Sequence, residues 1–88
     1  MSLGFPNASR SYDPDRHRIR FWGHDQAMEV PFLLDENVIF KLAPRTAHGE
    51  AGILAAFDAV RDRIHQVAMR VYAPGQRRSF YFLAASDF

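Results

Sequence analysis

The stretch ILAAFDAVRDRIHQVAMRVY, residues 53–72, decides the fold, because its apolar residues recur at alternating spacings of four and three. At about 100° per residue, such side chains fall within an arc of roughly 80° on one side of a helix. The stripe consists of Ile53, Phe57, Val60, Ile64, Val67 and Val71. The spacing predicts one long amphipathic helix, from just after Gly49 to about Ala73, which must bury its stripe against another part of the chain.

Two β-strands are predicted before this helix, because apolar and polar residues alternate there. The first covers Arg16 to Trp22 and the second Ala27 to Leu34, with Gly23 to Gln26 as the connection. The side chains expected to face the core are His17, Ile19 and Phe21 in the first strand, and Met28, Val30, Phe32 and Leu34 in the second.

The register expected for this hairpin joins apolar residues on one face and opposite charges on the other. Its pairs are Phe21 with Met28, Ile19 with Val30, and Arg20 with Glu29. A slip by one residue would move charges into the core. Pro31 lacks an N–H group, so it predicts that one side of the second strand is an edge or that pairing ends nearby.

Two further elements follow from local signals. Asp35 is a good N-cap for a short helix from Glu36 to Ala43, which Pro44 would end. An aromatic-rich strand is expected from Ser79 to Ala85, after Pro74-Gly75 stops the long helix. Its apolar residues fall on both faces, Phe80 and Phe82 on one and Tyr81 and Leu83 on the other, so both faces need cover.

Together these elements predict a single α+β domain spanning residues 1–88, with the order β-β-α-α-β and room for an extra N-terminal strand. The sheet is expected to be antiparallel, with three to four strands. One short helix and the long amphipathic helix would pack on a single face of it. That face would be formed by Ile19, Phe21, Val30 and Phe32.

Composition excludes several classes of function. The formal net charge is +1, so no global field would recruit nucleic acid or an anionic membrane. Absence of cysteine removes thiolate chemistry and most zinc sites, and the four scattered histidines form no close-spaced ligand pair, so we expect no metal and no cofactor. The longest uncharged runs are far shorter than the roughly 20 residues of a spanning helix. With no basic leader, a cytoplasmic location is the default expectation.

One row of side chains on the first predicted strand could contact an anion or single-stranded nucleic acid. It consists of Arg16, Arg18, Arg20 and Trp22, in which guanidinium groups stand beside an aromatic ring. The competing interpretation is a solvated strand face with Arg20 paired to Glu29. We prefer that interpretation, because stacking sites usually carry several aromatics on a basic domain.

Arg61 and His65 lie one turn apart at the edge of the predicted helix stripe and form a second candidate polar site. Arg61 could reach a carboxylate such as Asp58, which would make the pair a contact between helix and sheet, and we favour this interpretation. An exposed pair could instead bind an anion. Because no nucleophile or carboxylate is predictably beside them, and no Gly-x-Ser-x-Gly or glycine-rich phosphate loop occurs, we expect no catalytic activity.

The function best suited to these residues is a protein-interaction or self-association module, such as a homodimer. A chain of this size cannot easily cover both faces of its sheet, and the last strand has apolar residues on both. The alternative is a single-stranded nucleic-acid binder that uses Arg16, Arg18, Arg20 and Trp22. Nucleic acid is the less favoured partner, and no membrane contact is expected.

The order of several core positions resembles a family of small bacterial proteins known as domain of unknown function 1488. These positions are Tyr12-Asp13-x2-Arg16-x2-Ile19-x-Phe21, then Phe57-x3-Arg61-x2-Ile64-x3-Ala68-x3-Tyr72, then a closing strand ending in Asp87-Phe88. The resemblance covers nearly the whole chain. It implies a compact α+β fold and a small cytoplasmic protein, and it supplies no activity. The family often has an acidic residue where this chain has His65, which argues against a fixed arginine–carboxylate site there.

Overall fold

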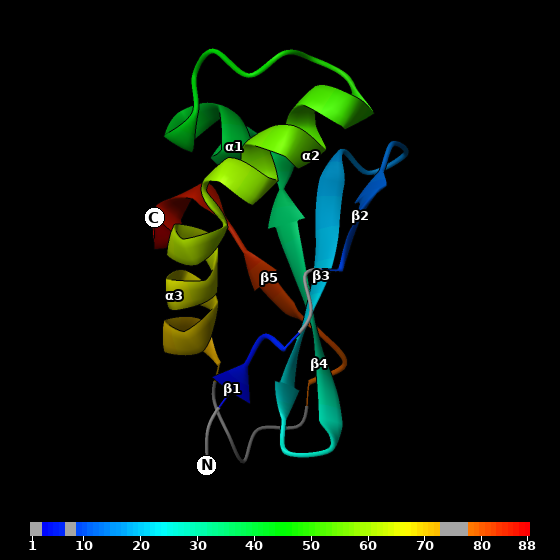
Figure 1. Cartoon of the computed structure of the whole chain (residues 1–88), viewed down its shortest axis with the longest axis vertical. Helices are drawn as coiled ribbons and strands as arrows, with labels where there is room; N and C mark the ends of the chain where they lie inside the picture. Colours follow the sequence, from blue (N-terminus) through cyan, green and yellow to red (C-terminus); the bar gives the residue numbers. More distant parts are fainter. Residues whose placement is uncertain (1–2, 7–8, 73–77) are drawn as a thin grey trace.

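The structure is a computed structural model that describes residues 3–6, 9–72 and 78–88. It consists of a mixed β-sheet with helices on one side (Figure 1). The strands are β1 (Leu3–Gly4), β2 (Arg10–Asp13), β3 (Arg18–Asp25), β4 (Met28–Asp35) and β5 (Tyr81–Leu83). The helices are α1 (Glu36–Leu42), α2 (Glu50–Ala59) and α3 (Arg61–Val71), followed by the 3₁₀ turn η1 (Ala85–Asp87). The α+β class is confirmed, and the order of elements differs from the predicted one.

The sheet is built around the antiparallel β3–β4 hairpin. On one side, β1 and β2 pair with opposite ends of β3, and on the other side β5 runs parallel to β4. The prediction of a purely antiparallel sheet is therefore wrong. The chain crosses through α1, α2 and α3 between β4 and β5, and such a crossover returns it to the starting end of the neighbouring strand, which makes the two strands parallel.

The register of the β3–β4 hairpin also differs from the expected one. Phe21 lies opposite Phe32 instead of Met28, and Ile19 lies opposite Leu34. The displacement is an even number of residues, so Ile19, Phe21, Val30, Phe32 and Leu34 keep their predicted face. Met28, also predicted to face the core, is 59% exposed at the end of the hairpin. The predicted contact between Arg20 and Glu29 does not form, because Arg20 lies opposite Leu33.

Gly23 explains the error in the register. Its presence suggested a turn, whereas it lies within β3, and Gln26, with φ 57°, turns the chain at residues 26–27. A Cβ atom at Gly23 would lie 2.9 Å from Leu3 Cδ1 and 3.0 Å from Phe5 Cε1. The glycine thus allows β1 to pack closely on the sheet, a long-range reason that a local pattern cannot reveal.

The start of β3 is a further correction. The predicted strand begins at Arg16 with His17 facing the core, whereas the observed strand begins at Arg18. His17 lies in the β2–β3 turn with φ 54° and an exposed side chain. The Asp13 carboxylate accepts hydrogen bonds from the backbone N–H groups of Asp15 and Arg16, at 3.0 and 3.3 Å, and so shapes this turn.

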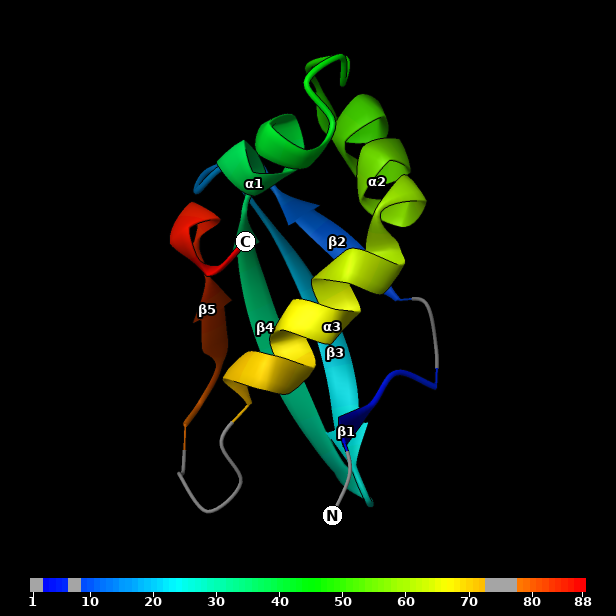
Figure 2. The same ribbon diagram turned by 90° about the vertical axis from the view of Figure 1, so that its left-hand side faces the viewer.

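The predicted long helix consists of two helices, α2 and α3, which meet at an angle at Val60 (Figure 2). Val60 leaves helical geometry with φ −111° and ψ 17°, and its N–H donates to the carbonyls of Ala56 and Phe57. The predicted end at Ala73 lies outside the described residues. The bend lets α2 contact β2 while α3 contacts β5, which a straight helix could not do over a twisted sheet.

The predicted packing of the helix stripe on the apolar face of the sheet is confirmed. Ile19, Phe21 and Phe32 of the sheet are buried together with Ile53, Phe57, Ile64 and Val67 of the helix stripe. Figure 2 shows α2 and α3 in front of the sheet, with α1 at the end where β4 finishes. The Asp35 cap of α1 is also confirmed, because its carboxylate accepts a 2.9 Å hydrogen bond from the Asn37 N–H.

The strand β5 has one covered and one exposed face. Tyr81 and Leu83 are buried in the core, whereas Phe80 and Phe82 are 48% and 43% exposed. Pro31 also has the expected effect, since β5 pairs with β4 only from Phe32 onward. No helix in residues 3–6, 9–72 and 78–88 has the length and apolar character needed to cross a membrane.

Candidate functional site

The face of the sheet that points away from α2 and α3 holds three of the four residues of the predicted arginine row. Alternation along each strand sends one set of side chains to the helices and the next to this side. We call this surface the open sheet face. Its side chains are Arg18, Arg20, Trp22 and His24 of β3, Glu29, Pro31, Leu33 and Asp35 of β4, and Phe82 of β5.

Arg16 does not belong to the open sheet face. It precedes β3 and lies in the β2–β3 turn, with its side chain 67% exposed and 3.8 Å from the Asp13 carboxylate. The predicted row therefore shortens to Arg18, Arg20 and Trp22. Alternation in sequence could not show where the strand begins, because arginine and histidine are compatible with both strand and turn.

The two arginines of the row have unusual surroundings. The Arg20 guanidinium carbon lies 5.4 Å from the centre of the Trp22 ring, in a cation–π contact. The Nε atom of Arg18 is covered and finds no hydrogen-bond partner among the described residues, although Asp13 and Asp35 lie opposite Arg18 in register. Asp35 instead caps α1, and Asp13 shapes the turn. The exposed Arg20 is thus the guanidinium that an external acid could reach, whereas the Nε atom of Arg18 is covered.

Leu33 and Phe82 form the apolar centre of the open sheet face. They lie opposite one another in the parallel β4–β5 pair, and Arg20 lies opposite Leu33 on the other side. Leu33 is only 8% exposed although it lies outside the main core cluster. Arg20, Leu33 and Phe82 thus lie side by side across β3, β4 and β5, and Glu29 lies four residues from Leu33 along β4.

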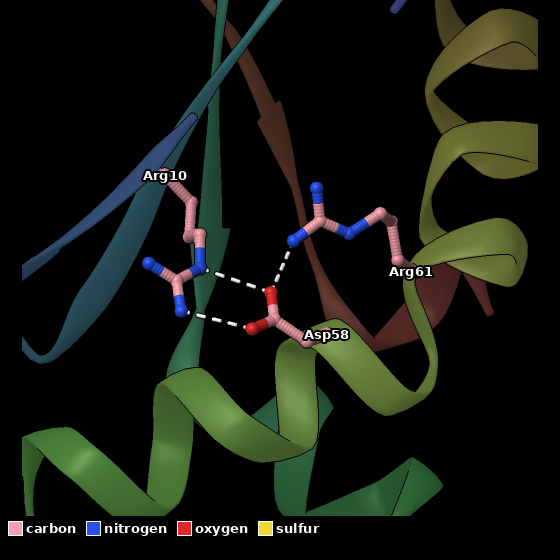
Figure 3. A network of polar contacts seen from close by, with 3 residues as sticks. All are labelled: Arg10, Asp58 and Arg61. Carbon is pink, nitrogen blue, oxygen red and sulfur yellow. Dashed lines mark hydrogen bonds and ion pairs between the residues drawn. The ribbon is translucent and has the colours of Figure 1, made fainter. Parts of the chain in front are cut away.

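Arg61, from the second predicted site, belongs to a network that connects the helices to the sheet (Figure 3). Arg10 of β2 donates two hydrogen bonds of 2.9 Å to the two carboxylate oxygens of Asp58 at the end of α2. Arg61, at the start of α3, donates to one of the same oxygens. The Arg10 guanidinium lowers the pKa of the Asp58 carboxyl, and Arg61 adds to this effect, while burial opposes it.

His65 does not join the Asp58 network. It is half-buried, with its ring stacked on Phe5 at a centroid distance of 3.8 Å and an interplanar angle of 6°. Burial is the main cause that lowers the pKa of His65, and the nearby charge of Arg61 adds to it. The structure places Arg61 in an ion-pair network and His65 in an aromatic stack, so these two side chains do not form one site.

Two tyrosine–carboxylate pairs connect other elements, and the sequence patterns missed both. Tyr12 of β2 donates a 2.5 Å hydrogen bond to Glu36 of α1, and Tyr72 donates one of the same length to Asp25 of β3. Each bond to a carboxylate raises the pKa of its tyrosine to about 12. Both pairs join residues far apart in the chain, so only the tertiary structure reveals them.

Within the described part of the chain, no three His, Asp or Glu side chains are grouped so that they could hold a metal ion. A cavity of about 410 Å³ lies along α3, lined by Asp62, Arg63, Gln66, Val67, Arg70 and Phe88. It includes neither Arg61 nor His65, and it holds no buried polar group without a partner among the described residues.

The fold defines a class of small α+β proteins, in which a mixed sheet is covered on one face by a bent pair of helices. The family model described as "Protein of unknown function (DUF1488)" matches residues 3–83, so the chain belongs to this family. No curated protein gives a significant match.

A solved structure is similar over most of the chain. It is the crystal structure of a protein of unknown function from the DUF1488 family of Shewanella loihica PV-4. The TM-score is 0.76 at 17% sequence identity, covering 93% of this chain and 91% of that one. The likeness supports the fold, and the predicted family resemblance is confirmed.

Proposed function

We propose that this protein is a non-catalytic, cytoplasmic interaction module that associates with a second copy of itself through the open sheet face. The observation that carries the proposal is the exposed Phe82, beside the nearly buried Leu33, on a sheet face that no helix of the described residues covers. Phe82 is 43% exposed, so covering the rest of its side chain contributes less than half of the about 1.5–3 kcal/mol gained when a phenylalanine is buried fully.

Charges on the open sheet face suit a second copy as the partner. Arg20 lies opposite Leu33, four residues along β4 from Glu29, so these two charges are about 13 Å apart along the strand. A twofold axis between them would place Arg20 of each copy against Glu29 of the other. The net charge of +1 adds little repulsion between copies.

The size of the face sets the expected affinity. An eight-residue strand is about 27 Å long, and three neighbouring strands are about 14 Å across. This footprint of roughly 380 Å² per copy is smaller than the about 800 Å² per partner of a standard specific interface, so the contact is a weak one. We therefore expect association in the micromolar range.

A charge-reversal experiment tests the twofold arrangement. The variants Arg20→Glu and Glu29→Arg each place like charges across the proposed interface, so each alone should be monomeric by light scattering. An equimolar mixture restores both opposite-charge contacts, so it should form a heterodimer. Arg63→Glu, a reversal on the exposed side of α3, should leave self-association unchanged. If the mixture stays monomeric while the wild type dimerises, the proposed contact is wrong.

A second candidate function is binding of single-stranded nucleic acid on the same surface. Two observations favour it: Arg18 and Arg20 have no carboxylate partner among the described residues, and Trp22 lies beside them as a stacking platform. The acidic neighbours Asp13 and Asp35 and the near-neutral charge weigh against it.

Titration with a short oligonucleotide distinguishes the two functions. Binding on this face should change Trp22 fluorescence at low salt and weaken steeply as salt rises. An unchanged Trp22 signal at low salt would exclude nucleic acid as the partner of this surface. Self-association through the same residues predicts no such dependence on oligonucleotide.

A further inference from the structure

The N-terminal residues 3–6, which we call the strap, lie over one end of the core and are held by few contacts. Only two residues pair with the sheet: Leu3 lies opposite Asp25, and Gly4 lies opposite His24. Leu3 and Phe5 are half-buried against the core cluster. A two-residue pairing contributes little by itself, so side-chain packing holds the strap in place.

Phe5 is the main anchor of the strap. Its ring stacks on the His65 imidazole, with centroids 3.8 Å apart and planes within 6° of parallel. The rings of Phe21 and Phe32 lie 6.0 Å from it in tilted arrangements. Phe5 therefore covers an aromatic surface formed by Phe21, Phe32 and His65, and removal of the strap would expose it.

His65 is the titratable group beneath the strap. The strap itself brings no charged side chain, and β3 contributes the Phe21 ring at 5.9 Å. The charges that act on His65 come from its own helix, where Arg61 disfavours the protonated ring and Asp62 favours it. Burial is the largest influence, and the pKa of His65 is lowered as a result.

We propose that the strap is a proton-sensitive cover, which protonation of His65 releases to expose the aromatic surface of Phe21 and Phe32. The docked state must keep a half-buried imidazole uncharged beside the Arg61 cation. Release gives the protonated ring access to water.

The direction of the pH effect follows from the lowered pKa. A histidine whose pKa is lower in the docked state binds its proton more weakly there, so acid favours release. The docked state is stable above the ordinary histidine pKa of about 6.5. It loses stability as pH falls through that value toward the lowered pKa. A cation–π contact between the protonated ring and Phe5 opposes release, whereas burial and the charge of Arg61 favour it.

Gly23 supplies a variant that disturbs the packing of the strap without acid. The methyl group of Gly23→Ala would lie 2.9 Å from Leu3 Cδ1 and 3.0 Å from Phe5 Cε1, so these strap side chains must move. Gly4→Ala is the matched control, because a Cβ atom there meets nothing within 4 Å.

The test is an NMR titration of the full chain from about pH 8 to about pH 5, which follows the His65 ring, the Leu3 methyl groups and the Gly4 amide. In the wild type, the strap signals should shift with the midpoint of the His65 titration, below about 6.5. Gly23→Ala should hold the strap signals near their acid positions at every pH and raise the pKa of His65 toward 6.5. Gly4→Ala should behave like the wild type.

Two results would overturn the proposal. Strap signals that stay at their neutral positions while His65 titrates would show that protonation does not release the strap. A pKa of His65 that is the same in Gly23→Ala and in the wild type would show that the strap does not influence the ring. If Gly23→Ala fails to fold, Phe5→Ser replaces it, because it removes the stacked ring directly and must raise the same pKa. Self-association plays no part in these signals, so the result is independent of the proposed function.

Discussion

Asp58 accepts hydrogen bonds from two arginines of different elements and so joins α2 and α3 to β2 at the edge of the sheet. Its side chain is 41% exposed, so solvent screening limits its contribution. The bidentate geometry from Arg10 raises that contribution above the level of an isolated surface pair.

Replacing Asp58 with Asn should lower the free energy of unfolding by about 1 kcal/mol, because one amide cannot accept both charged donors. Chemical denaturation at neutral pH measures this loss. Asp62→Asn, one turn further along and without a hydrogen bond in the described residues, should change stability by less than about 0.5 kcal/mol. Equal effects of the two substitutions would contradict the role of Asp58.

The Asp58 contribution should depend on pH in a defined direction. Its pKa is lowered in the folded state, so its stabilisation is present above the ordinary aspartate pKa of about 4 and disappears as pH falls through the lowered value. The difference in stability between the wild type and Asp58→Asn should therefore shrink below about pH 4.

Of the contacts in this network, the sequence predicts only the one between Asp58 and Arg61. Arg61 and Asp58 are three residues apart in the predicted helix, so spacing alone brings them close, and they stay close across the bend at Val60. Arg10 approaches from β2, and no pattern in its neighbourhood indicates that partner. The same limit applies to His65, whose stack on Phe5 depends on where the first strand packs.

At the scale of elements, Gly52 in α2 is an exception to the preference for alanine over glycine inside a helix. Replacing a glycine inside a helix with alanine usually stabilises by about 1 kcal/mol. Here the new Cβ atom would lie 2.3 Å from the carbonyl oxygen of Ala47, and backbone cannot move aside as cheaply as a side chain.

Gly52→Ala should therefore lower the midpoint of thermal unfolding, since displacing the Ala47 backbone outweighs the gain in helix propensity. Differential scanning calorimetry measures the shift. The reference substitution is Ala55→Gly at an exposed position of α2, which should cost about 1 kcal/mol from propensity alone. A rise in the midpoint for Gly52→Ala would show that the contact is not close in solution.

Most elements, and the faces they bury, follow from local patterns. The Asp35 cap, the alternation in β3 and β4 and the helix stripe all carry signals within a few residues. The direction of β5, the bend at Val60 and the hairpin register do not, because each depends on contacts between distant segments. Gly23 is the clearest case, since a glycine at this position suggests a turn, and only the packing of β1 against it explains its place within a strand.

At the scale of the whole molecule, the sheet has helices on one face, and the open sheet face carries both an apolar centre and opposite charges. The sequence indicated that the last strand had apolar residues on both sides. The structure identifies Phe82, with Phe80, as the exposed pair and buries Tyr81 and Leu83. The exposed apolar surface of the last strand is therefore that of Phe80 and Phe82.

Sedimentation velocity over a concentration series, comparing the wild type with Phe82→Arg and Met69→Arg, tests the central claim most directly. Each variant replaces an exposed apolar residue with arginine, Phe82 on the open sheet face and Met69 on α3. Self-association through the open sheet face predicts a wild-type dimer that forms in the micromolar range and is retained by Met69→Arg. Phe82→Arg should weaken it roughly tenfold or more. A wild type that stays monomeric at high micromolar concentration, or a dimer that Phe82→Arg leaves intact, would contradict the claim.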